Sequence, residues 1–190
     1  MNFKIKRQHL LLWVLLPFCI SAQNNHSTTG VEKITAFKQQ LQLLQTSPYK
    51  NLQWRLTGPD NRSGRCTDVY GIPGNPNVYY AAFATGGLWK TEDGGENWKP
   101  LFDKEATQSI GNMAVSLSNP DIVYVGTGEA NIFRASLPGI GMYKSINGGK
   151  NFQHIGLENT GTIARVIIHP SNPNMVYVAA SGNEWTYNKD

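Results

Sequence analysis

Cysteine is almost absent from this sequence, which has only Cys19 and Cys66 in 190 residues. Cys19 falls in a segment that we expect to be cleaved off, so Cys66 would be the single thiol of the mature chain. One thiol excludes an internal disulfide, and an exported chain without disulfides must be held by packing or by another chain. Cys66 lies in an apolar, strand-like run without a nearby catalytic pattern, which predicts a small buried core residue rather than a nucleophile.

The sequence also lacks an apolar run long enough to cross a bilayer, which takes roughly 20 residues. The longest run, Leu10 to Ile20, follows three basic residues and precedes the small residues Ser21 and Ala22. This order is typical of a secretory signal peptide over residues 1–22, cleaved near Ala22. A lipid anchor at Cys19 is the competing interpretation, although Pro17 and Phe18 stand where small residues are usual. We therefore expect a secreted, periplasmic or cell-surface protein.

An excess of either charge is missing once the signal peptide is set aside. The sequence has 17 Lys and Arg against 13 Asp and Glu, and three of the basic residues lie in residues 1–22, which leaves 14 against 13. A nearly neutral mature chain has no electrostatic basis for binding nucleic acid or an anionic membrane. The spacings of metal ligands, phosphate loops and serine nucleophiles are missing as well. The sequence thus indicates no metal, no cofactor and no catalytic residue.

Residues 23–50 form a leader with one helical pattern. The polar residues 24–30 are typical of a flexible segment. From Val31 to Gln45 the apolar residues are spaced by three and four, which predicts a short amphipathic helix. Ser47 and Pro48 mark its end.

Internal repetition is what the sequence has in abundance after residue 51. An Asn-Pro dipeptide followed by a strand of β-branched and aromatic residues begins at 75, 119 and 172, so the starts are 44 and 53 residues apart. A second pattern, over 87–98 and 141–152, is a strand that enters Asp-Gly-Gly or Asn-Gly-Gly and leaves through an aromatic residue. A third apolar run precedes each Asn-Pro. Four antiparallel strands in a repeat of this length make one propeller blade.

We therefore predict an all-β protein, a β-propeller of four-stranded antiparallel blades, over residues 51–190. Two blades are whole, and the third stops before its own Gly-Gly turn, which makes about two and a half blades. A propeller takes about four to eight blades. We expect the remaining blades to belong to the same, longer chain.

The segment Thr91 to Trp98 resembles the Asp-box, and Ser145 to Phe152 resembles a second copy with Asn147 in place of the Asp. The wider arrangement is similar to the N-terminal region of large exported bacterial proteins with Asp-box (BNR) repeats, described as sortilin-like or as glycosyl hydrolases with BNR repeats. The resemblance implies a structural turn whose Asp or Asn bonds the hairpin backbone and whose aromatic residue packs between sheets. The structural positions would be Thr91, Asp93, Gly95, Trp98, Ser145, Asn147, Gly149 and Phe152.

The resemblance allows an enzymatic role to be tested at one residue of this sequence. Xyloglucanases, which this chain resembles around residues 80–91, carry a catalytic Asp two positions before the Gly-Gly, where this sequence has Ala84. Glycoside hydrolysis normally needs two carboxylates, one as the acid and one as the base or nucleophile. The resemblance therefore argues against that activity within this segment.

Polar residues at repeated positions and in variable loops are the candidates for ligand binding. One polar residue stands seven positions before each Asn-Pro, where it either lines the central channel near its mouth or begins a strand in solvent. A longer loop at 128–139 and an aromatic residue in the third unit, suited to stacking on a sugar, add to this set. The candidates are Asp68, Asn112, Glu129, Arg134, Arg165 and Trp185.

These patterns together predict an exported β-propeller that acts as a binding or scaffolding module for protein or carbohydrate. The alternative is a glycan-active glycoside hydrolase whose catalytic carboxylates lie mostly beyond residue 190.

Overall fold

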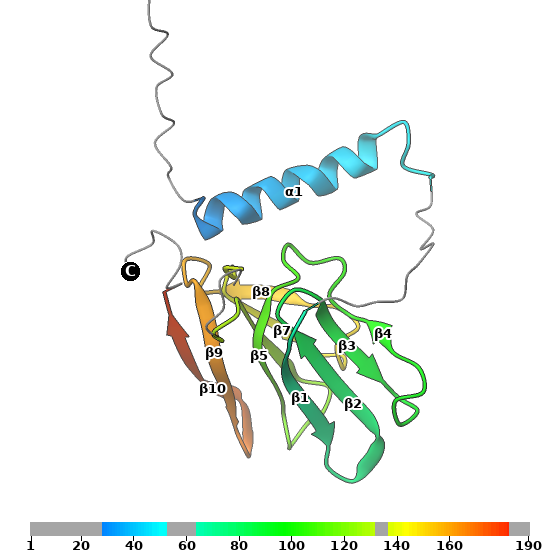
Figure 1. Cartoon of the computed structure of the whole chain (residues 1–190), viewed down its shortest axis with the longest axis vertical. Helices are drawn as coiled ribbons and strands as arrows, with labels where there is room; N and C mark the ends of the chain where they lie inside the picture. Colours follow the sequence, from blue (N-terminus) through cyan, green and yellow to red (C-terminus); the bar gives the residue numbers. More distant parts are fainter. Residues whose placement is uncertain (1–27, 53–63, 132–136, 183–190) are drawn as a thin grey trace, which may run out of the picture.

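The computed structural model describes residues 28–52, 64–131 and 137–182, in which one helix precedes three β-sheets (Figure 1). The predicted signal peptide, residues 1–22, lies outside these ranges. No helix within them is both long and apolar enough to span a bilayer.

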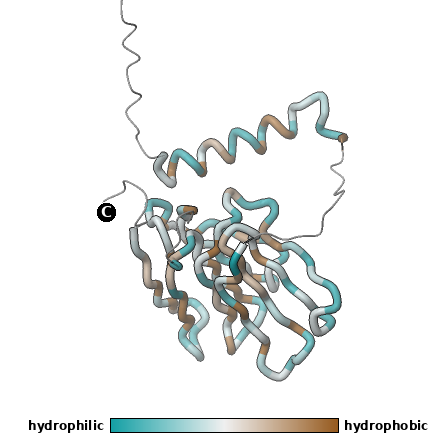
Figure 2. The backbone as a smooth tube through the Cα atoms, viewed as in Figure 1, coloured by the Kyte–Doolittle hydropathy of each residue, from teal (hydrophilic) through white to brown (hydrophobic). Residues whose placement is uncertain are grey.

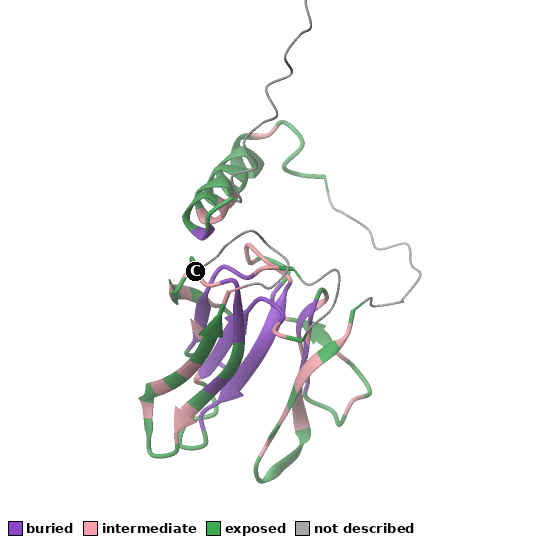
Figure 3. Cartoon of the chain, turned by 60° about the vertical axis from the view of Figure 1, so that its left-hand side comes forward, coloured by how far each residue is buried: buried purple, intermediate pink, exposed green. Residues whose placement is uncertain are grey.

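Helix α1 (Gly30–Thr46) begins at a capping box, in which the Thr29 hydroxyl accepts from the Glu32 amide at 3.2 Å and the Glu32 carboxylate accepts from the Thr29 amide at 2.7 Å. It is one residue longer at each end than the periodic pattern. Gly30 is buried and Ile34 packs against the larger core, while the second half of the helix is exposed (Figure 3). Hydrophobic positions recur along that uncovered half as well (Figure 2).

The three sheets are antiparallel and follow one another along the chain. The first sheet contains β1 (Cys66–Ile72), β2 (Asn75–Phe83), β3 (Gly87–Thr91) and β4 (Lys99–Pro100). The second contains β5 (Ile110–Val115), β6 (Val123–Thr127), β7 (Met142–Ser145) and β8 (Gln153–Gly156). The third pairs β9 (Thr162–His169) with β10 (Asn172–Ser181). Two four-stranded blades and half of a third confirm the predicted fold class.

The first strand of every blade carries a β-bulge at the same place. In each case the pairing with the second strand shifts just before the predicted polar position, so that Asp68 faces Ala82, Asn112 faces Gly126 and Arg165 faces Ala179. The three polar residues are therefore structurally equivalent, and the blades can be compared residue by residue.

The core lies between the blades rather than within any one of them. A larger apolar cluster fills the space between the first and second blades, and a smaller one fills the space between the second and third. Phe102 joins the first two blades, since its ring meets those of Tyr143 and Phe152 edge-on at centroid distances of 5.1 Å and 5.0 Å. All residues of β5 and β6 are buried, because the middle blade has a neighbour on both sides (Figure 3).

The turn from Thr91 to Trp98 is closed by its own side chains. Asp93 Oδ1 accepts from the Asn97 amide at 2.9 Å, and the Thr91 hydroxyl accepts from the Gly95 amide at 2.9 Å. The two turn glycines, Gly94 and Gly95, have φ of 76° and 102°, a region that favours glycine. A short polar side chain thus satisfies amides that the hairpin leaves unpaired.

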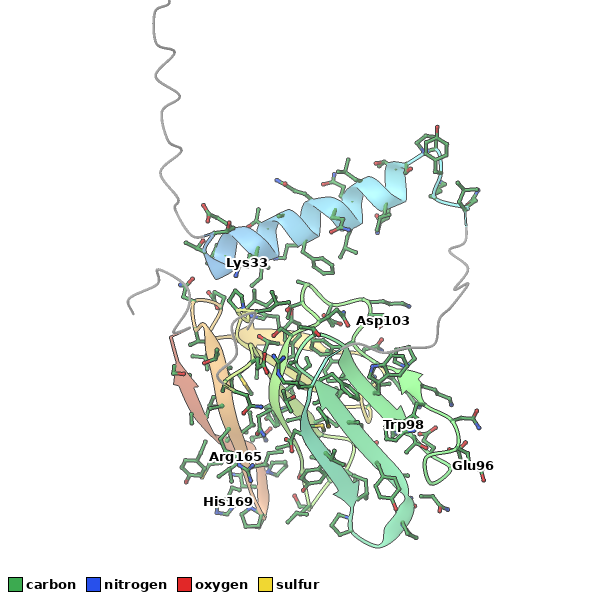
Figure 4. All side chains as sticks on the ribbon, viewed as in Figure 1. Lys33, Glu96, Trp98, Asp103, Arg165 and His169 are labelled. Atoms are coloured by element: carbon green, nitrogen blue, oxygen red, sulfur yellow. The ribbon has the colours of Figure 1, made fainter. Side chains whose placement is uncertain are left out.

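The second turn repeats this arrangement with an amide in place of the carboxylate. Asn147 Oδ1 accepts from the Asn151 amide at 3.0 Å, and the Ser145 hydroxyl accepts from the Gly149 amide at 2.9 Å. Phe152 packs against the larger core, whereas Trp98 donates its indole N–H to Gly95 within its own turn, at 3.1 Å (Figure 4). The two aromatic residues differ in their packing because the described residues contain no blade before the first one.

The charge of Asp93 predicts how its turn responds to acid. Hydrogen bonds from the Asn97 amide, the Asn97 side chain and the Thr91 hydroxyl lower the pKa of Asp93 to about 2. Because the folded-state pKa lies below the unfolded value of about 3.9, the contribution of Asp93 to stability is complete above that value and is lost as the pH falls toward 2. An NMR titration of the side chain should give a midpoint near pH 2. The Asp93→Asn variant should keep the turn and lose this pH dependence, and a midpoint near 4 would contradict the prediction.

The prediction for Cys66 is wrong, because its side chain is exposed. The equivalent residues of the next two blades, Ile110 and Ile163, are completely buried against the preceding blade. The strand pattern around Cys66 is that of a core position, but burial at that position requires a neighbouring blade, and the described residues supply none on this side of the first blade.

Candidate functional site

Five chain segments meet at the end of the sheets nearest to helix α1, which we call the upper face (Figure 1). They are the entry to β1 and the connections β2–β3, β4–β5, β6–β7 and β8–β9. The start of the innermost strand and the loop after the second strand do lie together here, since the Ala84 amide donates to Arg65 O at 2.8 Å and the Gly128 amide donates to Ser109 O at 2.9 Å. Variable loops on one face of a repeated scaffold are the usual place of recognition.

The long β6–β7 loop is anchored at both of its ends. The Ser109 hydroxyl donates to Leu137 O at 3.0 Å, and the Gly139 amide donates to Gly161 O at 2.8 Å. The Thr127 hydroxyl donates to Gly141 O at 2.7 Å and accepts from the Ile140 amide at 2.8 Å. The tip of the loop at 132–136, which contains the candidate Arg134, lies outside the described residues.

A half-buried ion pair joins this loop to the first blade. Arg65 Nε donates to Glu129 Oε1 at 2.6 Å, and Arg65 Nη2 bonds the other carboxylate oxygen. The Glu129 side chain is 0% exposed and that of Arg65 is 39% exposed, and the hydrogen bond to Glu129 raises the pKa of Arg65. A bidentate pair of this kind is both strong and specific in geometry. The Glu129 carboxylate therefore positions the loop through Arg65, while a contact of Glu129 with ligand stays a prediction.

Two of the equivalent polar residues meet between the blades. Asn112 Nδ2 donates to Asp68 Oδ2 at 2.7 Å, and the Met113 amide donates to the same oxygen at 3.1 Å. Asn112 Oδ1 in turn accepts from the Val166 amide at 2.7 Å. Asn112 is buried and Asp68 is half-buried, so this pair tethers the innermost strands of successive blades.

The other candidates are not part of this contact. Arg165 is exposed on the outer side of the third blade, away from the second (Figure 4). Trp185 lies outside the described residues. Binding of a ligand by any of the six candidates stays a prediction.

A hollow of about 250 Å³ opens on the upper face between α1 and the loops. It is bounded by the start of α1, by Pro138 and Gly139 of the β6–β7 loop, and by residues 158–161 before β9. Lys33 projects from the helix end nearest to the sheets, and burial lowers its pKa (Figure 4). Hydroxyl, amide and charged groups thus face one small volume, a set suited to hydrogen bonding with a polar ligand.

The described part of the upper face carries carboxylates at Glu158, beside the hollow, and at Asp103 and Glu105 on the β4–β5 connection. Ala84, where a carboxylate would stand by the xyloglucanase resemblance, is fully buried. Glu129 is paired with Arg65, which leaves Glu158 at the hollow. Within residues 28–52, 64–131 and 137–182, no three His, Cys, Asp or Glu side chains gather closely enough to hold a metal ion.

Sequence reasoning did not single out Arg65, Lys33 or residues 158–161. Arg65 stands beside a glycine at the start of a strand, but its pairing with a residue 64 positions away has no local signal. Lys33 belongs to a helix whose contact with the sheets follows from tertiary packing. The spacing of the loops around the repeats was the one signal that pointed to this face.

Comparison with known proteins supports the fold. No family model matches the sequence, and no curated protein matches it either. A solved structure of an ancestral GH74 enzyme is similar at 26% identity with a TM-score of 0.52, over 64% of this chain and 14% of that one. A GH74 enzyme of Niastella koreensis is similar at 23% identity with a TM-score of 0.42, over 57% of this chain and 16% of that one. YCF48 from Cyanidioschyzon merolae is similar at 19% identity with a TM-score of 0.42, over 63% of this chain and 41% of that one. With its antiparallel four-stranded blades, the chain forms part of a β-propeller, and it spans only a small part of the length of either GH74 enzyme.

Proposed function

We propose that this chain is part of an exported β-propeller of Asp-box repeats, of the sortilin-like kind, that binds carbohydrate at its upper face. The observation that carries the proposal is the hollow of about 250 Å³ between α1 and the β6–β7 and β8–β9 connections. Export rests on the signal-peptide pattern of residues 1–22, and the repeat type rests on the side-chain bonds within the turns at 91–98 and 145–152.

The chemistry of the hollow favours a sugar over an apolar ligand. Sites for drug-like molecules are mostly apolar with a few polar groups. This hollow is bounded by Thr29, Lys33, Glu158, Asn159 and Thr160, which together offer ammonium, carboxylate, amide and hydroxyl groups. Such a set can match the many hydroxyls of a carbohydrate, each of which both donates and accepts a hydrogen bond.

Anchoring of the neighbouring loop supports binding at this face. The half-buried Arg65–Glu129 pair and the bonds at Ser109 and Gly161 hold both ends of the β6–β7 loop beside the hollow. A loop held in place before the ligand arrives loses less conformational entropy on binding. The stem of the loop at Pro138 and Gly139 is therefore held in place beside the hollow.

A glycan-active glycoside hydrolase is the second candidate function. The likeness to the ancestral GH74 enzyme, at 26% identity, favours it. This activity needs paired carboxylates. By the xyloglucanase resemblance one of them would stand at the position of Ala84, which supplies none, and Glu129 is paired with Arg65. Its catalytic residues would then lie on further blades, which we propose belong to the same, longer chain.

Calorimetric titration of the secreted chain with soluble plant and host oligosaccharides tests the proposal. We expect at least one oligosaccharide to bind, and Lys33→Met and Glu158→Gln each to weaken it by roughly tenfold, because each removes a charge-assisted hydrogen bond. The matched controls are Lys150→Met and Glu96→Gln, at exposed residues that do not line the hollow; Glu96 lies at the opposite end of the first blade (Figure 4). They should leave the affinity unchanged.

The outcomes separate the two functions. Binding that is unaffected by both hollow variants, or absent for every oligosaccharide, would overturn the proposed site. Release of new reducing ends during the titration would instead support the hydrolase. Binding of a protein ligand without any sugar would favour a scaffolding role.

A further inference from the structure

A second hollow, of about 370 Å³, lies between the outermost strand of the first blade and the β7–β8 turn of the second. We call it the rim groove. Pro100 of β4 and the β4–β5 connection line one side of it, and residues 149–152 line the other. No residue lines both the rim groove and the hollow below α1. A ligand of the rim groove would therefore bind apart from the carbohydrate site.

The apolar part of the rim groove is fixed by packing between the two blades. Leu101 and Phe152 are half-buried and pack against the larger core. The Phe152 ring meets that of Phe102 edge-on at a centroid distance of 5.0 Å. Gly149 is buried, and a Cβ atom there would come within 2.7 Å of Leu101 Cδ1, so the blades touch closely here. A groove that is already formed loses less conformational entropy when a ligand binds.

Glu105 brings a carboxylate without a counter-ion to this groove. Its side chain is half-buried, yet within the described ranges it makes no ion pair and no hydrogen bond. Burial raises the pKa of Glu105. Burial and, second, the charge of Glu105 raise the pKa of the nearby Tyr143. A carboxylate that is withdrawn from water costs free energy, which a paired cation can offset.

A carboxylate beside an aromatic ring and an aliphatic wall is suited to an organic cation on an apolar stem. An arginine side chain has both parts. Its guanidinium can donate two parallel hydrogen bonds to the carboxylate and can lie against an aromatic ring, while its stem packs on apolar groups. The volume of the rim groove is near the lower end of the range of about 300 to 1,000 Å³ for ligand pockets, which suits one long side chain.

The exposed edge of the rim groove carries charges of both signs. Asp103 on the β4–β5 connection adds a carboxylate (Figure 4), and Lys104 and Lys150 add ammonium groups. These exposed charges are hydrated and screened by salt, so they act on a ligand less strongly than the half-buried Glu105 does. The two ammonium groups favour a ligand that has acidic residues next to its cation.

From this chemistry we propose that the rim groove binds an arginine side chain of a partner protein. The guanidinium would pair with the Glu105 carboxylate, and the stem would lie against Leu101 and Phe152. Acidic residues beside that arginine would meet Lys104 and Lys150. The inference does not rest on carbohydrate binding, because the two sites share no residue.

An NMR titration of the 190-residue chain with an acetylated and amidated peptide, one arginine between two aspartates, tests the proposal. We expect shifts of the Gly149 and Asn151 amides, which line the groove. Glu105→Gln should weaken binding by roughly tenfold, because it removes the charged acceptor. The same peptide with citrulline, a neutral isostere of arginine, should also bind roughly tenfold more weakly. Glu96→Gln, at an exposed position outside the groove, is the matched control and should leave the affinity unchanged.

The pH dependence of binding provides a second readout. The probe is N-acetyl-arginine amide, which has no carboxyl group of its own. Its affinity should fall as the pH is lowered from about 7 toward 4, because protonated Glu105 no longer attracts a cation. Glu105→Gln should remove this dependence. The midpoint of urea unfolding of this variant should be unchanged or higher, because the substitution removes a half-buried charge without a partner.

Three results would each overturn the proposal. They are the absence of binding for both arginine probes, equal affinity for the citrulline peptide, and an affinity that Glu105→Gln leaves unchanged. Shifts at Thr160 and Gly161 in place of Gly149 would put the peptide in the hollow below α1 and would also contradict it. Loss of oligosaccharide binding has no bearing on these outcomes, so the two proposals fail separately.

Discussion

Replacing Arg65 by alanine is expected to lower the free energy of unfolding by about 1 to 3 kcal/mol, the cost of leaving a buried acceptor without its partner. The substitution leaves the Glu129 carboxylate, which is 0% exposed, without its partner. Water has little access to such a position in the parent chain, so part of the desolvation cost that the pair had offset remains. The cost stays below the range for a fully buried pair because Arg65 is 39% exposed, so water can enter part of the space that its side chain leaves.

Glu129→Gln should lower the free energy of unfolding by less than Arg65→Ala does. It leaves a guanidinium that is already 39% exposed, whereas the other variant leaves a carboxylate that is 0% exposed in the parent chain. Urea unfolding followed by circular dichroism measures both, and Lys150→Ala, at an exposed position, is the control with an expected change below about 0.5 kcal/mol. The reverse order of the two costs, or a loss below about 1 kcal/mol for Arg65→Ala, would show that Glu129 is not buried in solution. Hydrogen exchange should also rise at both stems of the β6–β7 loop.

Asn112→Ala is expected to lower the free energy of unfolding by about 3 kcal/mol, because its side chain makes two contacts between blades. Its oxygen accepts from the buried Val166 amide, and its nitrogen donates to Asp68. Without the side chain the Val166 amide has lost its acceptor in a place that water cannot easily reach. The loss should appear in the midpoint of urea unfolding, and Asn151→Ala, at an exposed position, is the matched control.

Asn112→Asp distinguishes the oxygen from the nitrogen. It keeps an acceptor for the Val166 amide but places a second carboxylate where Asn112 Nδ2 lies 2.7 Å from Asp68 Oδ2. Repulsion raises the folded-state pKa of the introduced carboxyl above its unfolded value of about 3.9, so the folded state binds the proton more tightly. The stability of this variant relative to the parent should therefore rise as the pH falls from 7 toward 4. A deficit that does not change with pH would contradict the assignment of the Asn112–Asp68 contact.

Local chemistry determined the elements of this fold, and they were predictable from the sequence. The left-handed backbone at Gly94 and Gly148 is a preference of single residues and their neighbours, so the Gly-Gly pattern located both hairpins. The period of the repeats likewise indicated four strands to a blade and placed Asp68, Asn112 and Arg165 at equivalent positions. These features depend on contacts within a few residues, which is why no knowledge of the neighbouring blades was needed.

The tertiary structure alone decided which of these positions are buried, which form an ion pair and which contact another blade. Cys66, Ile110 and Ile163 occupy one strand position, yet only the first is exposed, because burial there is supplied by a different blade. The sequence indicated Glu129 as a ligand-binding loop residue, whereas in the fold it is paired with Arg65, which lies 64 positions away in the sequence. A single sequence carries no signal for such a pairing, since the energy of a contact depends on the distance and solvation that only the assembled blades provide.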